Sequence, residues 1–174
     1  MSINSRAKGA RLERAIAIDL RRWLGDDWLV SRNRTDQQCG QDGINAGEFA
    51  FSGPSVHPLC WELKSDGGFD ERQLFGAPIR GPLPKFWQQC ATQAESLAPE
   101  VYKHPILVCK RTRGPTLAFV RPRTNYALMK AGSERPVMRD ILVNGDTLDG
   151  DLLQCWRWGD LLKLNSLCLR ELAL

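Results

Sequence analysis

Residues 59–65, LCWELKS, place two opposite charges inside an apolar run. Side chains alternate across a strand, so Glu62 and Lys64 share one face with Cys60, while Trp61 and Leu63 take the other. Burying a charge is costly unless a partner compensates it. The chain must therefore fold around a strand that presents one face to a core and carries charged groups with a specific environment on the other.

The segment just before it, EFAF at 48–51, alternates in the same way, and the turn-rich stretch 52–58 joins the two. We therefore expect a β-hairpin of 48–51 with 59–65. If the aromatic faces bury together, Glu48 converges with Glu62 and Lys64 on the opposite face. Two close carboxylates raise each other's pKa unless a cation lies between them, and Mg²⁺ prefers such hard oxygen ligands. The alternative is an exposed strand face with an ordinary cross-strand Glu–Lys pair.

A helix is predicted over 5–24, with Ser5 as its N-cap and Gly25 at its end. Glu13 lies at the edge of its buried stripe, which consists of Leu12, Ile16, Leu20, Trp23 and Leu24. A second helix is predicted from Pro84 to residue 98. Further strands are expected at 28–34, 104–111, 116–122 and 140–145, a helix at 155–164, and loops at 35–47 and 67–84.

The six cysteines are scattered without a CxxC pair, which favours buried reduced thiols. The net charge of +4 is unevenly spread, because residues 1–34 hold eight bases against four acids and residues 103–123 hold six bases and no acid. Such basic stretches favour a polyanionic partner. No segment has the pattern of a secretory signal or of a membrane span, so a cytoplasmic location, with no membrane partner, is expected.

The order of these segments resembles the PD-(D/E)xK nuclease superfamily, and within it the archaeal and phage-type Holliday junction resolvases. The resemblance rests on a KG-xxx-E helix (Lys8, Gly9 and Glu13), basic VSRNR, a Gly-rich loop, an acid-bearing strand with WELK, a helix FWQQCATQA and a strand HPILVCKR. It covers about residues 4–122. It implies an α/β fold with a restriction-endonuclease-like core, a mixed central β-sheet flanked by helices, at 1–123. Residues 124–174 would form a C-terminal extension packed on that core.

The resemblance also implies roles for individual residues. Glu62 would be a metal ligand and Lys64 the catalytic lysine. Glu13 would reach the metal through water or fix Lys64. Gln88 or Gln89 matches the helical Gln near the site, and Gln89 is the catalytic candidate.

The upstream acid departs from the family pattern, which usually has an Asp after Pro. This chain offers Glu48, fourteen residues before Glu62, or Asp42, twenty before. Glu48 is preferred because it begins the strand expected to pair with 59–65, and it is the further catalytic candidate. The candidate metal ligands are therefore Glu13, Asp42, Glu48 and Glu62.

The expected function is that of a Mg²⁺- or Mn²⁺-dependent endodeoxyribonuclease, acting as a homodimer that nicks opposed strands of branched DNA in a bacterial or phage-infected cell. The expected phosphate contacts are Arg6, Lys8, Arg32, Arg34, Lys110, Arg111 and Arg113. The alternatives are another nuclease of this fold, of the restriction, repair or flap-cutting kind, and a DNA-binding module that has lost its site. If neither upstream acid binds metal, the chain binds DNA without cutting it.

Overall fold

The structure is a computed structural model of the 174-residue chain. It describes residues 3–26, 28–32, 47–53, 55, 57–65, 69–70, 72, 74, 81–96, 103–130, 139–143, 151–164, 166 and 169.

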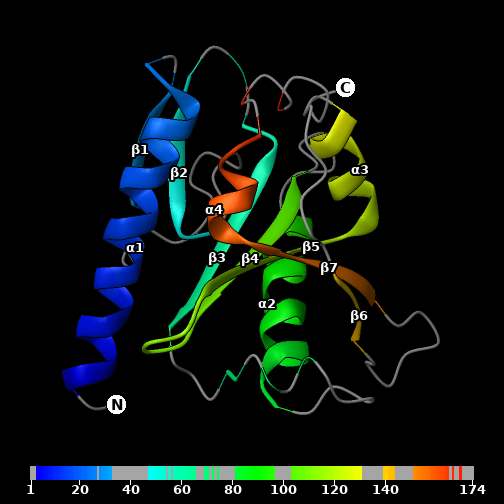
Figure 1. The fold of residues 1–174 in the computed structure, drawn as a ribbon. Helices are drawn as coiled ribbons and strands as arrows, with labels where there is room; N and C mark the ends of the chain where they lie inside the picture. The colour runs from blue at the N-terminus through cyan, green and yellow to red at the C-terminus, as the bar shows by residue number, and fades with distance from the viewer. Residues whose placement is uncertain are drawn as a thin grey trace.

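A mixed five-stranded sheet forms the centre of the molecule (Figure 1), in the order β3-β4-β5-β7-β6. Strand β3 pairs parallel with β4, and the other three pairings are antiparallel. The charged segment 59–65 is thus an edge strand. The strands are β3 (Leu59–Ser65), β4 (His104–Lys110), β5 (Thr116–Val120), β6 (Arg139–Val143) and β7 (Asp151–Arg157).

Helices cover both faces of this sheet. Helix α1 (Ile3–Leu24) packs its apolar stripe on the face that carries Trp61 and Leu63, together with α3 (Pro122–Lys130) and α4 (Trp158–Leu161). Helix α2 (Leu83–Glu95) covers the other face, where Leu107 and Phe119 point. The expected α/β architecture, a mixed central sheet flanked by helices, is confirmed.

Helix α1 ends as predicted, because Gly25 adopts a positive φ of 72° just after the last turn. Its beginning differs. The helix already starts at Ile3, so Ser5 lies within it and the prediction of Ser5 as N-cap is wrong. Each residue added to an existing helix gains a hydrogen bond, and no helix breaker precedes Ser5 to stop this extension.

The predicted hairpin of 48–51 with 59–65 is wrong. Strand β2 (Phe49–Ser52) pairs antiparallel with β1 (Leu29–Arg32) in a separate two-stranded sheet beside α1. In the segment between β2 and β3, His57 stacks on Phe51 with ring centroids 3.7 Å apart. The predicted common burial of Phe49, Phe51, Trp61 and Leu63 is confirmed, because all four belong to one core cluster.

The C-terminal region contributes directly to the central sheet. Strand β6 lies where a strand was predicted, but the helix predicted at 155–164 is mostly wrong. Residues 155–157 end β7, and only Trp158–Leu161 are helical. Trp156 lies opposite Ala118 of β5 and is fully buried, so pairing and burial override the local helical pattern. The division at residue 123 remains a prediction; β7 and β5 are neighbours in one sheet.

Two further sequence predictions concern thiols and membranes. Cys60, Cys90, Cys109 and Cys155 are buried and free, as predicted, while Cys39 and Cys168 lie outside the described residues. In the part of the chain that the structure describes, no helix is both long and apolar enough to cross a membrane.

Candidate active site

Glu62 and Lys64 lie on the face of β3 that meets α2. Their register partners in β4 are Leu107 and Cys109, which belong to the core on that side. The side chain of Glu62 is only 2% exposed, and Lys64 Nζ donates a hydrogen bond to Glu62 Oε1. The Lys64 ammonium also lies 5.6 Å from the ring centroid of Phe86 on α2. The buried carboxylate is thus paired, as a charge in an apolar strand must be.

Glu48 reaches the same region by a short parallel bridge between Gly47 and Trp61. The backbone N–H of Glu48 donates to the Trp61 carbonyl oxygen at 2.7 Å. Gly47 adopts a φ of 86°, and a Cβ there would lie 2.4 Å from the same carbonyl oxygen. Only glycine permits this approach, so Gly47 fixes the backbone of Glu48 beside β3.

The electrostatics of Glu48 reflect neighbouring acids. Its pKa is raised from 4.5 to about 7, first by burial and then by the nearby negative charges of Glu62 and Glu13. Lys64 and Arg32 act in the opposite direction and offset only part of this effect. The predicted convergence of Glu48, Glu62 and Lys64 is therefore present, through a bridge rather than a hairpin.

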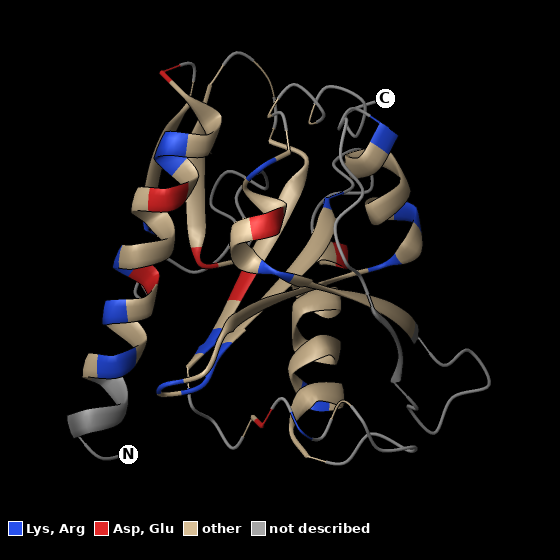
Figure 2. Cartoon of the chain, in the orientation of Figure 1, with Lys and Arg blue, Asp and Glu red and all other residues tan. Residues whose placement is uncertain are grey.

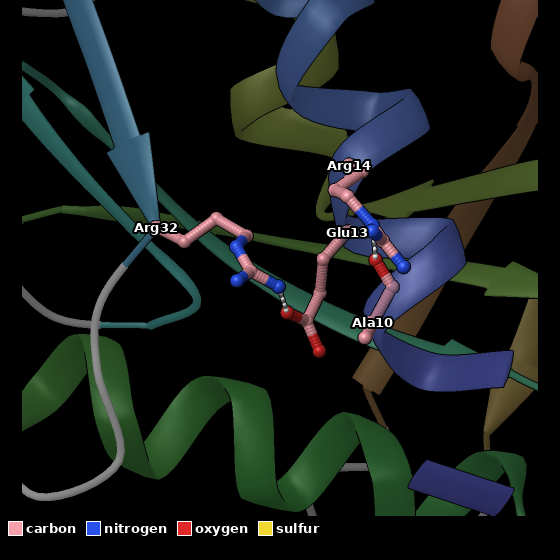
Figure 3. Close-up of polar contacts among 4 residues, drawn as sticks. All are labelled: Ala10, Glu13, Arg14 and Arg32. Atoms are coloured by element: carbon pink, nitrogen blue, oxygen red, sulfur yellow. Dashed lines mark hydrogen bonds and ion pairs between the residues drawn. The ribbon is translucent and has the colours of Figure 1, made fainter. Parts of the chain in front are cut away.

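Glu13 approaches from α1 and joins the end of β1 (Figure 3). Its Oε2 accepts a hydrogen bond from Arg32 Nη1 at 2.8 Å. Arg14, the next residue, instead donates to the Ala10 carbonyl along the helix, away from Arg32. Glu13 therefore pairs with Arg32, while Lys64 pairs with Glu62; the alternative in which Glu13 fixes Lys64 is not the arrangement seen.

Glu62 and Lys64 lie on an edge strand, with Glu48 bridged to it and Glu13 approaching from α1. This arrangement agrees with the comparison of the chain with protein families. The family described as "Phage putative PDDEXK endonuclease" matches residues 4–159. The chain belongs to this family. Neither a curated protein nor a solved structure matches the chain.

Membership makes the chain a nuclease of the PD-(D/E)xK superfamily with a restriction-endonuclease-like fold, and it implies a DNA substrate. The match extends beyond residue 123 into the C-terminal region, further than the resemblance over 4–122. It thus includes β7, the strand that completes the sheet next to β5.

Nucleases of this superfamily generally use divalent metals, and the acids of this PD-(D/E)xK endonuclease fit such an ion. Glu48 and Glu62 offer hard oxygen donors, and the pKa of Glu48 is raised first by burial and then by the charges of Glu62 and Glu13, effects that a cation beside it would offset. Among the described residues, no three His, Cys, Asp or Glu side chains lie close enough to enclose an ion. Mg²⁺ commonly takes only one or two carboxylates and keeps several waters, so two acids suffice.

The remaining predicted residues are placed less centrally. Gln88 and Gln89 are exposed on α2, and their side chains make no hydrogen bond to any described residue. Asp42 and Arg34 lie outside the described residues, as does the side chain of Arg6.

Sequence reasoning missed two residues of α2. Phe86 lies beside the Lys64 ammonium, and Gln93, further along the helix, has a buried side-chain oxygen without a hydrogen-bond partner among the described residues. Gln93 lies seven residues, or two turns, after Phe86 and so shares its stripe of the helix. In the sequence, the sign that pointed to Gln93 was that the segment FWQQCATQ contains a third Gln.

Four of the predicted DNA contacts of this endonuclease gather at one place. Figure 2 shows basic residues along the N-terminal half of α1 and at the tip of the β4–β5 hairpin. Both segments line one pocket of about 500 Å³, to which Lys8, Lys110, Arg111 and Arg113 contribute. Arg32 does not line this pocket and stays with Glu13.

Proposed function

We propose that this chain is a metal-dependent endodeoxyribonuclease that resolves branched DNA, Holliday junctions in particular, by paired nicking of phosphodiester bonds. The observation that carries the proposal is the meeting of Glu48, Glu62 and Lys64 at one edge of the central sheet, with Glu48 left partly uncompensated. An acidic pair beside a lysine suits phosphodiester hydrolysis, in which negative charge grows on the phosphate.

Glu62 and Glu48 would hold the ion, Mg²⁺ or Mn²⁺. When bound, it would supply positive charge that polarises the scissile phosphate. Glu62 also holds the ammonium of Lys64 in place from a buried position. Lys64, whose side chain is 20% exposed, is then free to donate one of its remaining protons in a hydrogen bond to a phosphate oxygen.

Arg32 is the proposed phosphate contact on the other side of the site. Glu13 holds its guanidinium by one nitrogen, and the Arg32 side chain is 44% exposed. An arginine so oriented keeps donors for a phosphate. The basic residues of α1 and of the β4–β5 hairpin would contact the DNA backbone without reading bases.

The branched substrate, the homodimer and the cytoplasmic location are supported by the resemblance to phage-type resolvases and by the phage endonuclease family. Two opposed strands need two sites, which a symmetric dimer supplies. A nuclease of the same fold that acts on flaps or duplex DNA is the alternative, and a binding module without activity is the third possibility.

The test is to incubate the protein with a synthetic four-way junction and Mg²⁺ or Mn²⁺. Symmetric paired nicks are expected, and Lys64→Ala and Glu62→Gln should each lower the rate by about 100-fold or more. Duplex, flap and single-stranded substrates, run in parallel, separate the alternatives. The proposal fails if the junction stays intact, or if Lys64→Ala cuts as fast as the wild type. Light scattering of the protein with the junction measures whether a dimer binds.

A further inference from the structure

The pocket of about 500 Å³ lies across the sheet from Glu62 and Lys64. Helix α1 lines it with residues spaced three or four apart, a single stripe of the helix: Lys8, Arg11, Leu12, Ala15, Ile16 and Asp19. The β4–β5 hairpin supplies the opposite wall. Ser65, the last residue of β3, lies in the lining, next in the chain to Lys64 but on the other face of the strand.

The lining of this pocket is strongly positive. Five bases line it, against the single acid Asp19. The carboxylate of Asp19 accepts a hydrogen bond from Trp158 Nε1 at 2.9 Å, and Arg111 is paired with Asp70 at 3.0 Å. The side chains of Arg11 and Arg113 have no hydrogen-bond or ion-pair partner within the described part of the chain. Two unpaired guanidinium groups on one concave surface make an anion site.

Arg113 also adopts a backbone conformation that arginine rarely takes. Its φ is +63°, the one positive value at a non-glycine residue in the described chain. Gly114 follows directly, so a glycine at 113 would fit the turn with less strain. A strained residue whose side chain lines a pocket indicates a role for that side chain.

The pocket also has an apolar part. Leu12, Ile16 and Trp158 are buried residues that line it. A volume of about 500 Å³ lies within the range of pockets that hold small organic molecules. The lining therefore combines basic donors suited to a phosphate with apolar side chains. A nucleotide has matching parts, an anionic phosphate and a base with an apolar face.

We infer that this pocket holds one nucleotide of the DNA that has left the base stack, with its phosphate on Arg11 and Arg113 and its base on the apolar part of the lining. The inference rests on the proposed function and adds that the DNA is bound with a nucleotide extruded beside the cut. A base inside a continuous duplex is stacked on both sides, whereas a base at a branch point or in a flap leaves the stack at a lower cost. Because Ser65 and Lys64 are adjacent, a strand passing the end of β3 can meet both sites.

The test measures binding in EDTA, where no cleavage occurs, by fluorescence anisotropy. The labelled probes are a blunt duplex, the same duplex with a three-thymidine flap, and that flap with abasic residues. The wild type should prefer the thymidine flap to the duplex by at least about fivefold, and abasic residues should remove the preference. Arg11→Ala and Arg113→Gly should each lose it, although Arg113→Gly should have an unchanged or higher Tm.

Arg22→Ala is the matched control, because Arg22 is an exposed arginine on the same helix outside the pocket. It should retain the flap preference. The inference is overturned if the abasic flap binds as tightly as the thymidine flap, or if Arg11→Ala and Arg113→Gly weaken binding to every probe equally. Cleavage with Mg²⁺ is measured separately. A flap preference without cleavage would contradict the proposed function. Cleavage without that preference would contradict only the inference that the pocket binds a nucleotide.

Discussion

Burial disfavours the charged form of Glu48, and Glu62 and Glu13 repel its negative charge. Lys64 and Arg32 offset only part of these effects. The Glu48 pKa of about 7 means that the folded protein holds a proton on this carboxyl more tightly than the unfolded chain, where the value is 4.5. An acid kept in such a place destabilises the metal-free fold at neutral pH. This cost is expected of a residue retained for binding a cation rather than for stability.

Glu48→Gln should therefore stabilise the metal-free protein at high pH. The contribution of protonated Glu48 is fully present below pH 4.5 and is lost as the pH rises through 7. The full shift corresponds to about 3 kcal/mol, and solvent screening reduces the expected effect to about 1–2 kcal/mol. Urea unfolding in EDTA at pH 5 and pH 8 measures it.

The wild type should lose stability relative to Glu48→Gln as the pH rises from 5 to 8. His57, whose pKa burial lowers to about 3, affects stability as the pH falls below 6.5, but it does so equally in both proteins. Addition of Mg²⁺ at pH 8 should raise the Tm of the wild type and leave that of Glu48→Gln nearly unchanged. Identical pH dependence in the two proteins would contradict the convergence of the acids.

Lys64→Met removes the partner of a carboxylate that is only 2% exposed. We expect a loss of about 3 kcal/mol in the free energy of unfolding, because Glu62 is left buried and unpaired. The double variant Glu62→Gln/Lys64→Met should recover most of this loss and still fail to cut DNA. Urea unfolding at pH 8 checks the stability, and a stable single variant would mean that Glu62 has another compensating group.

Elements of this fold were predictable to different degrees. The alternation in 59–65 correctly assigned Trp61 and Leu63 to the core and Glu62 and Lys64 to the other face, because faces depend only on local geometry. The pairing partner of 48–51 depends on residues far along the chain, which is why the hairpin was wrong. In the same way, Trp156 and Trp158 alternate as a strand does, but residues 155–164 also fit a helix, and the neighbouring β5 decides between them.

Gly47 is the residue that positions β2 against β3, and Gly25 offers a matched control. Both adopt positive φ, but a Cβ at Gly25 meets nothing within 4 Å, whereas one at Gly47 meets the Trp61 backbone. Gly25→Ala should cost about 1 kcal/mol of stability and leave cleavage intact. Gly47→Ala should cost more and lower the cleavage rate, since Glu48 must shift. Unfolding and nicking assays on both variants measure this, and equal effects would exclude the positioning role.

At the scale of the whole molecule, the C-terminal region belongs to the central sheet rather than lying outside it. Strand β7 covers the edge of β5 and buries Trp156 completely. A fragment of residues 1–123 would expose the β5 edge and part of both cores. We expect it to lack a cooperative unfolding transition in urea, in contrast to the full chain. A cooperative transition in the fragment would favour an independent core at 1–123.

The pocket between α1 and the β4–β5 hairpin could not be predicted in the same way. Both basic segments were visible in the sequence as phosphate contacts, but nothing local brings Arg11, Arg113 and Trp158 to the same pocket. Their meeting depends on the packing of α1 and α4 on one face of the sheet. The candidate site was easier to recognise, because a charge in an apolar strand is unusual in itself.

The central claim is that Glu48 and Glu62 together hold a divalent cation at the edge of β3. Anomalous diffraction from a crystal soaked in Mn²⁺ tests it most directly. We predict a manganese peak between these two carboxylates in the wild type and no such peak in Glu62→Gln. A wild-type map without manganese density there, or with the same peak in both proteins, would contradict the claim.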